Sequence, residues 1–109
     1  MIDLEKMAKE HEDLFPLADL QSQVIKLEEE LIELHNAVEF DDILKEKADV
    51  IIVCIGIYRF APAVASYLMP SALSELEEKE VLRKWQINLK RKWEWNGKTY
   101  HHIKTGEED

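Results

Sequence analysis

The segment 50–58 constrains the fold most, because every one of its residues is apolar or a glycine. Its β-branched residues would also suit a strand. Ile43, Leu44 and Ala48 lead into the segment at helical spacing with no turn signal, so the sequence predicts one helix over about 42–60. A helix that is apolar on every side must lie at the centre of a fold or in a subunit interface.

A membrane span is the other explanation for this apolar segment. A span needs about 20 consecutive apolar residues, whereas the strictly apolar part ends at Tyr58 and is followed by Arg59 and Pro62. The sequence therefore predicts a buried helix and no membrane association. The N-terminus is acidic and amphipathic, unlike a signal peptide. The single cysteine, Cys54, is typical of a buried thiol in a reducing compartment, so we expect a cytoplasmic protein.

Two helices are expected before the apolar segment. Asp3 suits the N-cap of a helix over 3–14, and Pro16 suits the first turn of a second helix that extends to about residue 38. The second helix has the clearest apolar periodicity in the chain, with spacings of 3, 4, 3 and 4. Its stripe consists of Val24, Leu27, Leu31, Leu34 and Val38.

After the apolar segment, residues 61–70 are expected to form a connector with room for a short helix. Ser71 or Ser74 could cap a last helix that reaches about residues 91–93, and Glu77 would complete a capping box with Ser74. Aromatic residues then flank Asn96-Gly97, a pair that favours a type I′ turn in a small β-hairpin.

These elements predict an all-α fold, an antiparallel bundle of four or five helices with a small C-terminal β-hairpin. The chain has no internal repeat and no linker. We therefore expect one helical domain over 1–104, followed by a loose acidic tail over 105–109.

Acidic charge is concentrated in the first half of the chain. The formal net charge is −9, and residues 1–50 alone hold 15 acidic and five basic side chains. Residues 79–104, by contrast, hold eight basic and two acidic side chains. The overall acidity argues against nucleic-acid binding, which needs a basic footprint. An acidic half beside a basic segment fits a divalent cation that carries a polyphosphate, although most such charges coat solvated helix faces.

Carboxylates recur at helical spacing on two of the predicted helices. Glu30 and Glu33 lie three residues apart on the second helix, and Glu46 and Asp49 do so on the third. Residues three apart share a helix face, so antiparallel packing would bring all four into one cleft, where their repulsion is costly without a cation. Oxygen ligands without His or Cys suit Mg²⁺, or Mn²⁺, better than Zn²⁺. From this pattern alone, a metal site and a solvated face both remain possible.

Basic and amide side chains share one face of the last predicted helix. Lys84, Asn88 and Arg91 follow at i, i+4 and i+7. Arg offers forked donors and Lys a point charge, so this face could clamp a phosphate, although cations also suit a helix C-terminus. Beside a four-carboxylate metal site, the clamp is the better interpretation. Gln23 lies seven residues before Glu30 on the same helix face, where it could contact a base or be solvated.

Aromatic and histidine side chains are less informative. Four aromatic residues could stack on a base, but such residues more often pack in cores and interfaces; these are Trp85, Trp93, Trp95 and Tyr100. His101 and His102 would point to opposite faces of a strand, which argues against joint metal ligation. His11 and His35 have no visible partner, and we expect them on the surface.

The stretches KLEEELIEL over 26–34 and EKADV over 46–50 resemble the EExxE…ExxD signature of MazG-like nucleoside triphosphate pyrophosphohydrolases. That superfamily also includes dimeric dUTPases, dCTP pyrophosphatases and phosphoribosyl-ATP pyrophosphatase. The spacing of Lys84, Asn88 and Arg91 is similar to the family's basic motif on its final helix. The resemblance covers about residues 20–93, and it departs near Ile32, where many members have a smaller residue.

The resemblance implies that Glu30, Glu33, Glu46 and Asp49 bind Mg²⁺, with Glu29 as a supporting carboxylate or a water-orienting base. It also implies hydrolysis of nucleoside triphosphates at the α–β phosphate bond, in nucleotide-pool housekeeping, by a homodimer or a dimer-of-dimers tetramer. The alternative is a non-enzymatic helical-bundle protein with an interaction or regulatory role, whose acidic face is solvated. That alternative predicts little change when an acidic residue is replaced.

Overall fold

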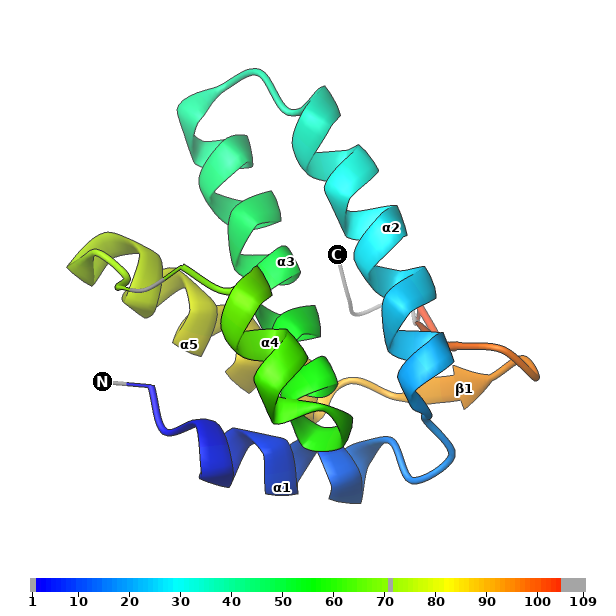
Figure 1. Cartoon of the computed structure of the whole chain (residues 1–109). Coiled ribbons are helices and arrows are strands. Elements are labelled where there is room, and N and C mark those ends of the chain that lie inside the picture. Colours follow the sequence, from blue (N-terminus) through cyan, green and yellow to red (C-terminus); the bar gives the residue numbers. More distant parts are fainter. Residues whose placement is uncertain (1, 71, 105–109) are drawn as a thin grey trace.

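The computed structural model describes residues 2–70 and 72–104, and this part of the chain is mostly helical (Figure 1). A two-stranded antiparallel sheet follows the last helix. The elements are α1 (Leu4–Leu14), α2 (Leu20–Asn36), α3 (Phe40–Phe60), α4 (Pro62–Leu68), α5 (Glu75–Lys90), β1 (Trp93–Trp95) and β2 (Tyr100–His102). The expected acidic tail, 105–109, lies outside the described residues.

The apolar segment is helical and central, as predicted. It forms the second half of α3, where residues 51–57 are all buried, and α3 contacts each of the other four helices. Burial also raises the pKa of the Cys54 thiol to about 11. No helix in the described part of the chain is long and apolar enough to cross a bilayer. The core around α3 is completed by side chains from α1 and α5, including Met7, Val81 and Trp85.

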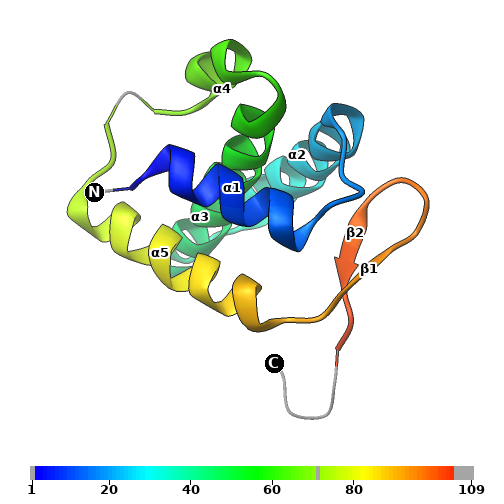
Figure 2. The same cartoon turned by 90° about the horizontal axis from the view of Figure 1, so that it is seen from below.

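The helices do not all follow one axis. α2 and α3 run antiparallel and side by side, whereas α1 lies across one end of this pair (Figure 1). The β1–β2 hairpin lies beyond the C-terminal end of α5, beside the turn that joins α1 to α2 (Figure 2). The Leu17 N–H donates to the Tyr100 hydroxyl at 3.0 Å and ties that turn to the hairpin. This arrangement places the hairpin near the first turns of α2.

The start of α2 differs from the prediction. Asp3 caps α1 as expected, since its carboxylate accepts from the Lys6 N–H. Pro16 is not in the first turn of α2 but in the turn before it. Asp19 and Ser22 form a reciprocal capping box that fixes the helix start at Leu20. Their side chains accept from two backbone N–H groups, whereas the proline side chain has no acceptor to offer.

The apolar stripe of α2 is largely exposed in the single chain. The exposed fractions of Val24, Leu31 and Val38 are 42%, 46% and 82%. The buried residues of α2 are instead the polar Ser22 and Gln23. The reason is that α2 packs mainly on α3, and the described part of the chain places no second helix over its apolar face. The predicted stripe is therefore present, but no second helix packs over it in the described part of the chain.

The C-terminal elements largely follow the prediction. Ser74 caps α5 and forms the expected capping box with Glu77; the other candidate cap, Ser71, lies outside the described residues. The hairpin is present, but its turn is not type I′. That type needs positive φ at both central residues, whereas Gly97 is the only described residue with positive φ. The Asn96 side chain accepts instead from the Lys98 and Thr99 N–H groups.

Candidate functional site

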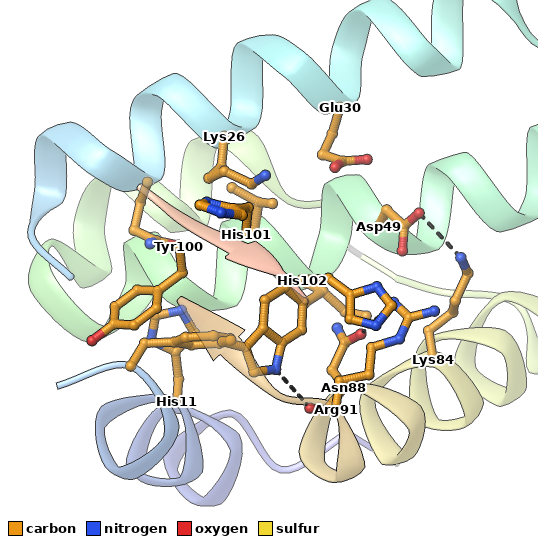
Figure 3. Close-up of a pocket in the computed structure, with 15 residues that line it drawn as sticks. His11, Lys26, Glu30, Asp49, Lys84, Asn88, Arg91, Tyr100, His101 and His102 are labelled. Atoms are coloured by element: carbon orange, nitrogen blue, oxygen red, sulfur yellow. Dashed lines mark hydrogen bonds and ion pairs between the residues drawn. The ribbon is translucent and has the colours of Figure 1, made fainter. Parts of the chain in front are cut away.

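A cavity of about 250 Å³ lies between α2, α3, α5 and the hairpin. Figure 3 shows two ends with different chemistry: Glu30, Asp49 and Lys84 at one, His11 and Tyr100 at the other. All four residues expected to bind substrate line this cavity, namely Gln23, Lys84, Asn88 and Arg91. The α2–α3 antiparallel pair and the face of α5 opposite it bring these side chains together.

Three of the four predicted metal ligands come together. Glu30 from α2 and Glu46 and Asp49 from α3 each offer a carboxylate oxygen, and these oxygens lie within 4.8 Å of one another. All three residues are half-buried. The fourth predicted ligand, Glu33, is exposed and lies outside this group. We call Glu30, Glu46 and Asp49 the carboxylate cluster.

Burial raises the pKa of every member of the carboxylate cluster, and repulsion within the cluster raises the pKa of Glu30 and Glu46 as well. The pKa of Glu30 is raised to about 7, mainly by burial and in addition by the charges of Asp49, Glu46 and Glu33. Burial also raises the pKa of Glu46 and of Asp49. Such environments disfavour the charged form unless a cation is present. The cluster therefore has the chemistry of a cation site with hard oxygen ligands.

Basic side chains surround the carboxylate cluster. Lys84 Nζ lies 3.2 Å from Asp49 Oδ2, and both side chains are mostly buried. The charges of Lys84 and Arg91 both act to lower the pKa of Asp49, against the effect of burial. Arg91 Nη1 donates to Asn88 Oδ1 at 3.4 Å. The basic face of α5 is thus turned toward the carboxylates and can meet an anion beside them.

The predicted catalytic carboxylate, Glu29, lies outside the cavity. Its side chain is exposed and forms an ion pair with Lys26 at 2.9 Å. Lys26 itself lines the cavity, and its charge acts to lower the pKa of Glu30. The sequence reasoning overlooked Lys26, although its position four residues before Glu30 places both on one helix face.

Aromatic side chains form the other end of the cavity. Phe15, Trp93 and Tyr100 line it, with ring centroids 5.1 Å apart for Phe15–Trp93 and 5.0 Å for Phe15–Tyr100. His101 and His102 also line it. The remaining aromatic candidates lie elsewhere. Trp85 belongs to the core, and Trp95 packs on Tyr100.

The expectation that His11 is a surface residue was wrong, whereas His35 is exposed as expected. Only 3% of His11 is exposed, and its ring stacks with Trp85 at a centroid distance of 6.4 Å. A signal was present in the sequence. His11 follows the buried Met7 by four residues on the same face of α1, and the buried Phe15, directly after the helix, follows His11 by four.

Comparison of the chain with models of protein families, with curated proteins and with solved structures found no match.

Proposed function

We propose that this chain is a Mg²⁺-dependent nucleoside triphosphate pyrophosphohydrolase that acts in nucleotide-pool housekeeping in the cytoplasm. It would cleave the α–β phosphate bond and release a nucleoside monophosphate and pyrophosphate. One observation carries this proposal. Carboxylates from α2 and α3 meet the basic face of α5 in a single cavity with an aromatic end. A cation, a polyphosphate and a base would each find matching chemistry there.

The carboxylate cluster fits Mg²⁺, or Mn²⁺, on its donor set. All three residues offer oxygen, and burial makes their charged forms costly without a cation. Glu30, Glu46 and Asp49 would hold the ion, and Glu33 would add negative charge from just outside. When bound, Mg²⁺ supplies a coordinated water of lowered pKa and neutralises phosphate oxygens.

The remaining residues would position the substrate and the water. Lys84 and Arg91 can stabilise the charge that develops on the leaving pyrophosphate, and Asn88 holds Arg91 in place through its side-chain oxygen. Glu29 stays our proposed water-orienting carboxylate. In support, Glu29 pairs with Lys26, which itself lines the cavity.

The test is hydrolysis of a panel of NTPs and dNTPs with and without Mg²⁺, with pyrophosphate scored separately from orthophosphate. We expect Mg²⁺-dependent release of pyrophosphate and monophosphate in equal amounts. Release of orthophosphate alone would place the cleaved bond elsewhere. If no nucleotide is turned over at high protein concentration, the alternative of a helical interaction protein with a solvated acidic face is favoured.

We further propose that two copies of this chain associate through α2, as a homodimer or within a dimer of dimers. The support is the exposed apolar stripe of α2, together with the exposed Phe40 and Ile43 at the start of α3. Short chains often gain stability by oligomerising, because one chain buries too little apolar surface. Sedimentation velocity should therefore give a dimer or a tetramer. Leu31→Glu should shift it to monomer, and a wild-type monomer at all concentrations would contradict the proposal.

A further inference from the structure

A series of hydrogen-bonded polar side chains links α3, α1 and α2 beside the cavity. Arg59 Nη1 lies 3.3 Å from His11 Nδ1 and also donates to the Phe15 carbonyl at 2.9 Å. His11 forms a side-chain hydrogen bond with Gln23. Gln23 Nε2 donates in turn to Ser22 Oγ at 3.4 Å. The exposed fraction of Gln23 is only 7%, yet Gln23 and His11 both line the cavity.

Arg59 fixes which atoms donate and which accept along this series of hydrogen bonds. Arginine can only donate, so His11 Nδ1 must accept. A neutral imidazole that accepts at Nδ1 carries its proton on Nε2, and Nε2 therefore donates to Gln23. Burial and the nearby Arg59 charge lower the pKa of His11 to about 4, which agrees with a neutral ring at pH 7. Gln23 must then accept with Oε1 and donate with Nε2.

Gly56 makes room for this arrangement. A Cβ atom at Gly56 would lie 2.2 Å from Gln23 Oε1 and 2.7 Å from His11 Nε2. Glycine inside a helix costs about 1 kcal/mol relative to alanine. The only glycine of α3 thus lies where His11 of α1 and Gln23 of α2 pack against the backbone of α3.

We propose that Arg59 and His11 are positioning residues that hold Gln23 with an amide N–H toward the cavity, so that the site selects bases bearing a carbonyl over bases bearing an amino group. An amide nitrogen has two hydrogens. One is directed at Ser22 Oγ, and in this proposal the other is offered to a ligand. Because Oε1 is held beside His11 Nε2 and Gly56, Gln23 Nε2 and not Oε1 would face the exocyclic group of a base. This inference rests on the proposed function.

The position of Gln23 suits contact with a base. It lies seven residues before Glu30 on α2, which is about 10.5 Å along the helix axis. That separation is comparable with the length of a nucleotide from its α-phosphorus to the edge of its base. Phe15, Trp93 and Tyr100 surround the same end of the cavity and offer ring faces for stacking.

The first experiment measures kcat/KM of the wild-type protein for two pairs of substrates, ITP against ATP and dUTP against dCTP. Each pair exchanges a carbonyl for an amino group on the same ring system. We expect the carbonyl member to be preferred roughly ten- to hundredfold in each pair, because an amino group would bring a donor against the buried donor of Gln23. Equal values, or a preference for the amino member, would overturn the inference.

Three variants test the orientation of the amide itself. Gln23→Glu presents an acceptor in place of the N–H, so the preference should reverse toward ATP and dCTP. Gly56→Ala displaces Gln23 Oε1 and should bring both ratios close to one. Cys54→Ala, a buried residue of the same helix that does not line the cavity, should keep the wild-type ratios. Unchanged ratios in Gln23→Glu would overturn the inference.

Binding of monophosphates without metal separates this inference from the proposed function. Quenching of tryptophan fluorescence by IMP, AMP, UMP and CMP can be followed because Trp93 lines the cavity. If triphosphates are hydrolysed without a base preference, only the role of Gln23 fails. If no triphosphate is hydrolysed and no monophosphate binds, the proposed function fails with it. Tighter binding of IMP than AMP supports the role of Gln23 whether or not hydrolysis is observed.

Discussion

Replacement of Glu30 by Gln is expected to abolish Mg²⁺-dependent pyrophosphate release and at the same time to stabilise the metal-free protein. Glu30 is the only member of the carboxylate cluster that comes from α2. Without its charge, we expect hydrolysis to fall by roughly a thousandfold, because the stabilisation that a bound metal supplies amounts to several kcal/mol. Steady-state assays of pyrophosphate release, with Mg²⁺ varied up to saturation, measure this effect.

The gain in stability follows from the raised pKa of Glu30. Its pKa is about 7 in the folded protein, mainly because of burial, against 4.5 in the unfolded chain. The unfolded state loses its proton first as the pH rises, so the metal-free fold becomes less stable between about pH 4.5 and 7. Glu30 is only partly buried, and solvent screening reduces the penalty to ~1–2 kcal/mol above pH 7. Glu30→Gln removes this penalty.

Urea unfolding in EDTA at pH 5 and pH 8 measures the predicted difference. The wild-type protein should lose stability between the two values, and Glu30→Gln should lose less. Glu28→Gln is the matched control, since Glu28 is an exposed residue of α2 that does not line the cavity. This control should leave both hydrolysis and the pH dependence as in the wild type. A clear loss of stability in metal-free Glu30→Gln would instead assign Glu30 a structural role.

The sequence predicts the helices well where local chemistry alone decides them. The run of apolar residues in α3 has to be buried wherever the helix lies, and this part was predicted correctly. The Ser74–Glu77 capping box depends only on residues three apart, so it too could be predicted. Pro16 was placed wrongly because both the turn and the first helical turn tolerate proline, and the Asp19–Ser22 box decided between them.

The carboxylates show what residue spacing alone can predict and what it cannot. Residues three apart on a helix differ by about 60° around its axis, since each residue turns about 100°. That angle is small enough to predict that Glu30 and Glu33 are neighbours. It is also large enough for Glu30 to face α3 while Glu33 faces solvent. The rotation of α2 is set by its packing on α3, which no local pattern contains.

The rotation of α2 about its axis also explains why its apolar stripe is exposed. An apolar stripe normally faces the core of its own chain. In α2 the polar Gln23 is buried instead, because it pairs with His11 against the open backbone of Gly56. His11 could be recognised as buried from its spacing to Met7 and Phe15, but its partner lies on another helix. Long-range polar pairs of this kind have no signature in a single sequence.

The second large effect is expected at Lys84. Its ammonium group lies 3.2 Å from Asp49 Oδ2 and is the counter-ion of that carboxylate. A cation that binds the carboxylate cluster must compete with this ion pair. Once displaced, Lys84 is free to meet a phosphate beside the metal. Lys84→Met keeps most of the apolar stem and removes the charge, so it separates these two roles.

We expect Lys84→Met to bind Mn²⁺ several-fold more tightly in the absence of nucleotide and yet to release pyrophosphate about a hundredfold more slowly. Tighter binding follows because the cluster is more negative without the ammonium group; the rate falls because a positive group near the leaving pyrophosphate is lost. Titration calorimetry with Mn²⁺ and steady-state kinetics measure the two effects.

Lys79→Met is the control, since Lys79 is an exposed residue of α5 that pairs with Glu75, and it should change neither Mn²⁺ binding nor the rate. Weaker Mn²⁺ binding in Lys84→Met would mean that the ion pair organises the cluster, whereas undiminished pyrophosphate release would remove Lys84 from the proposed clamp.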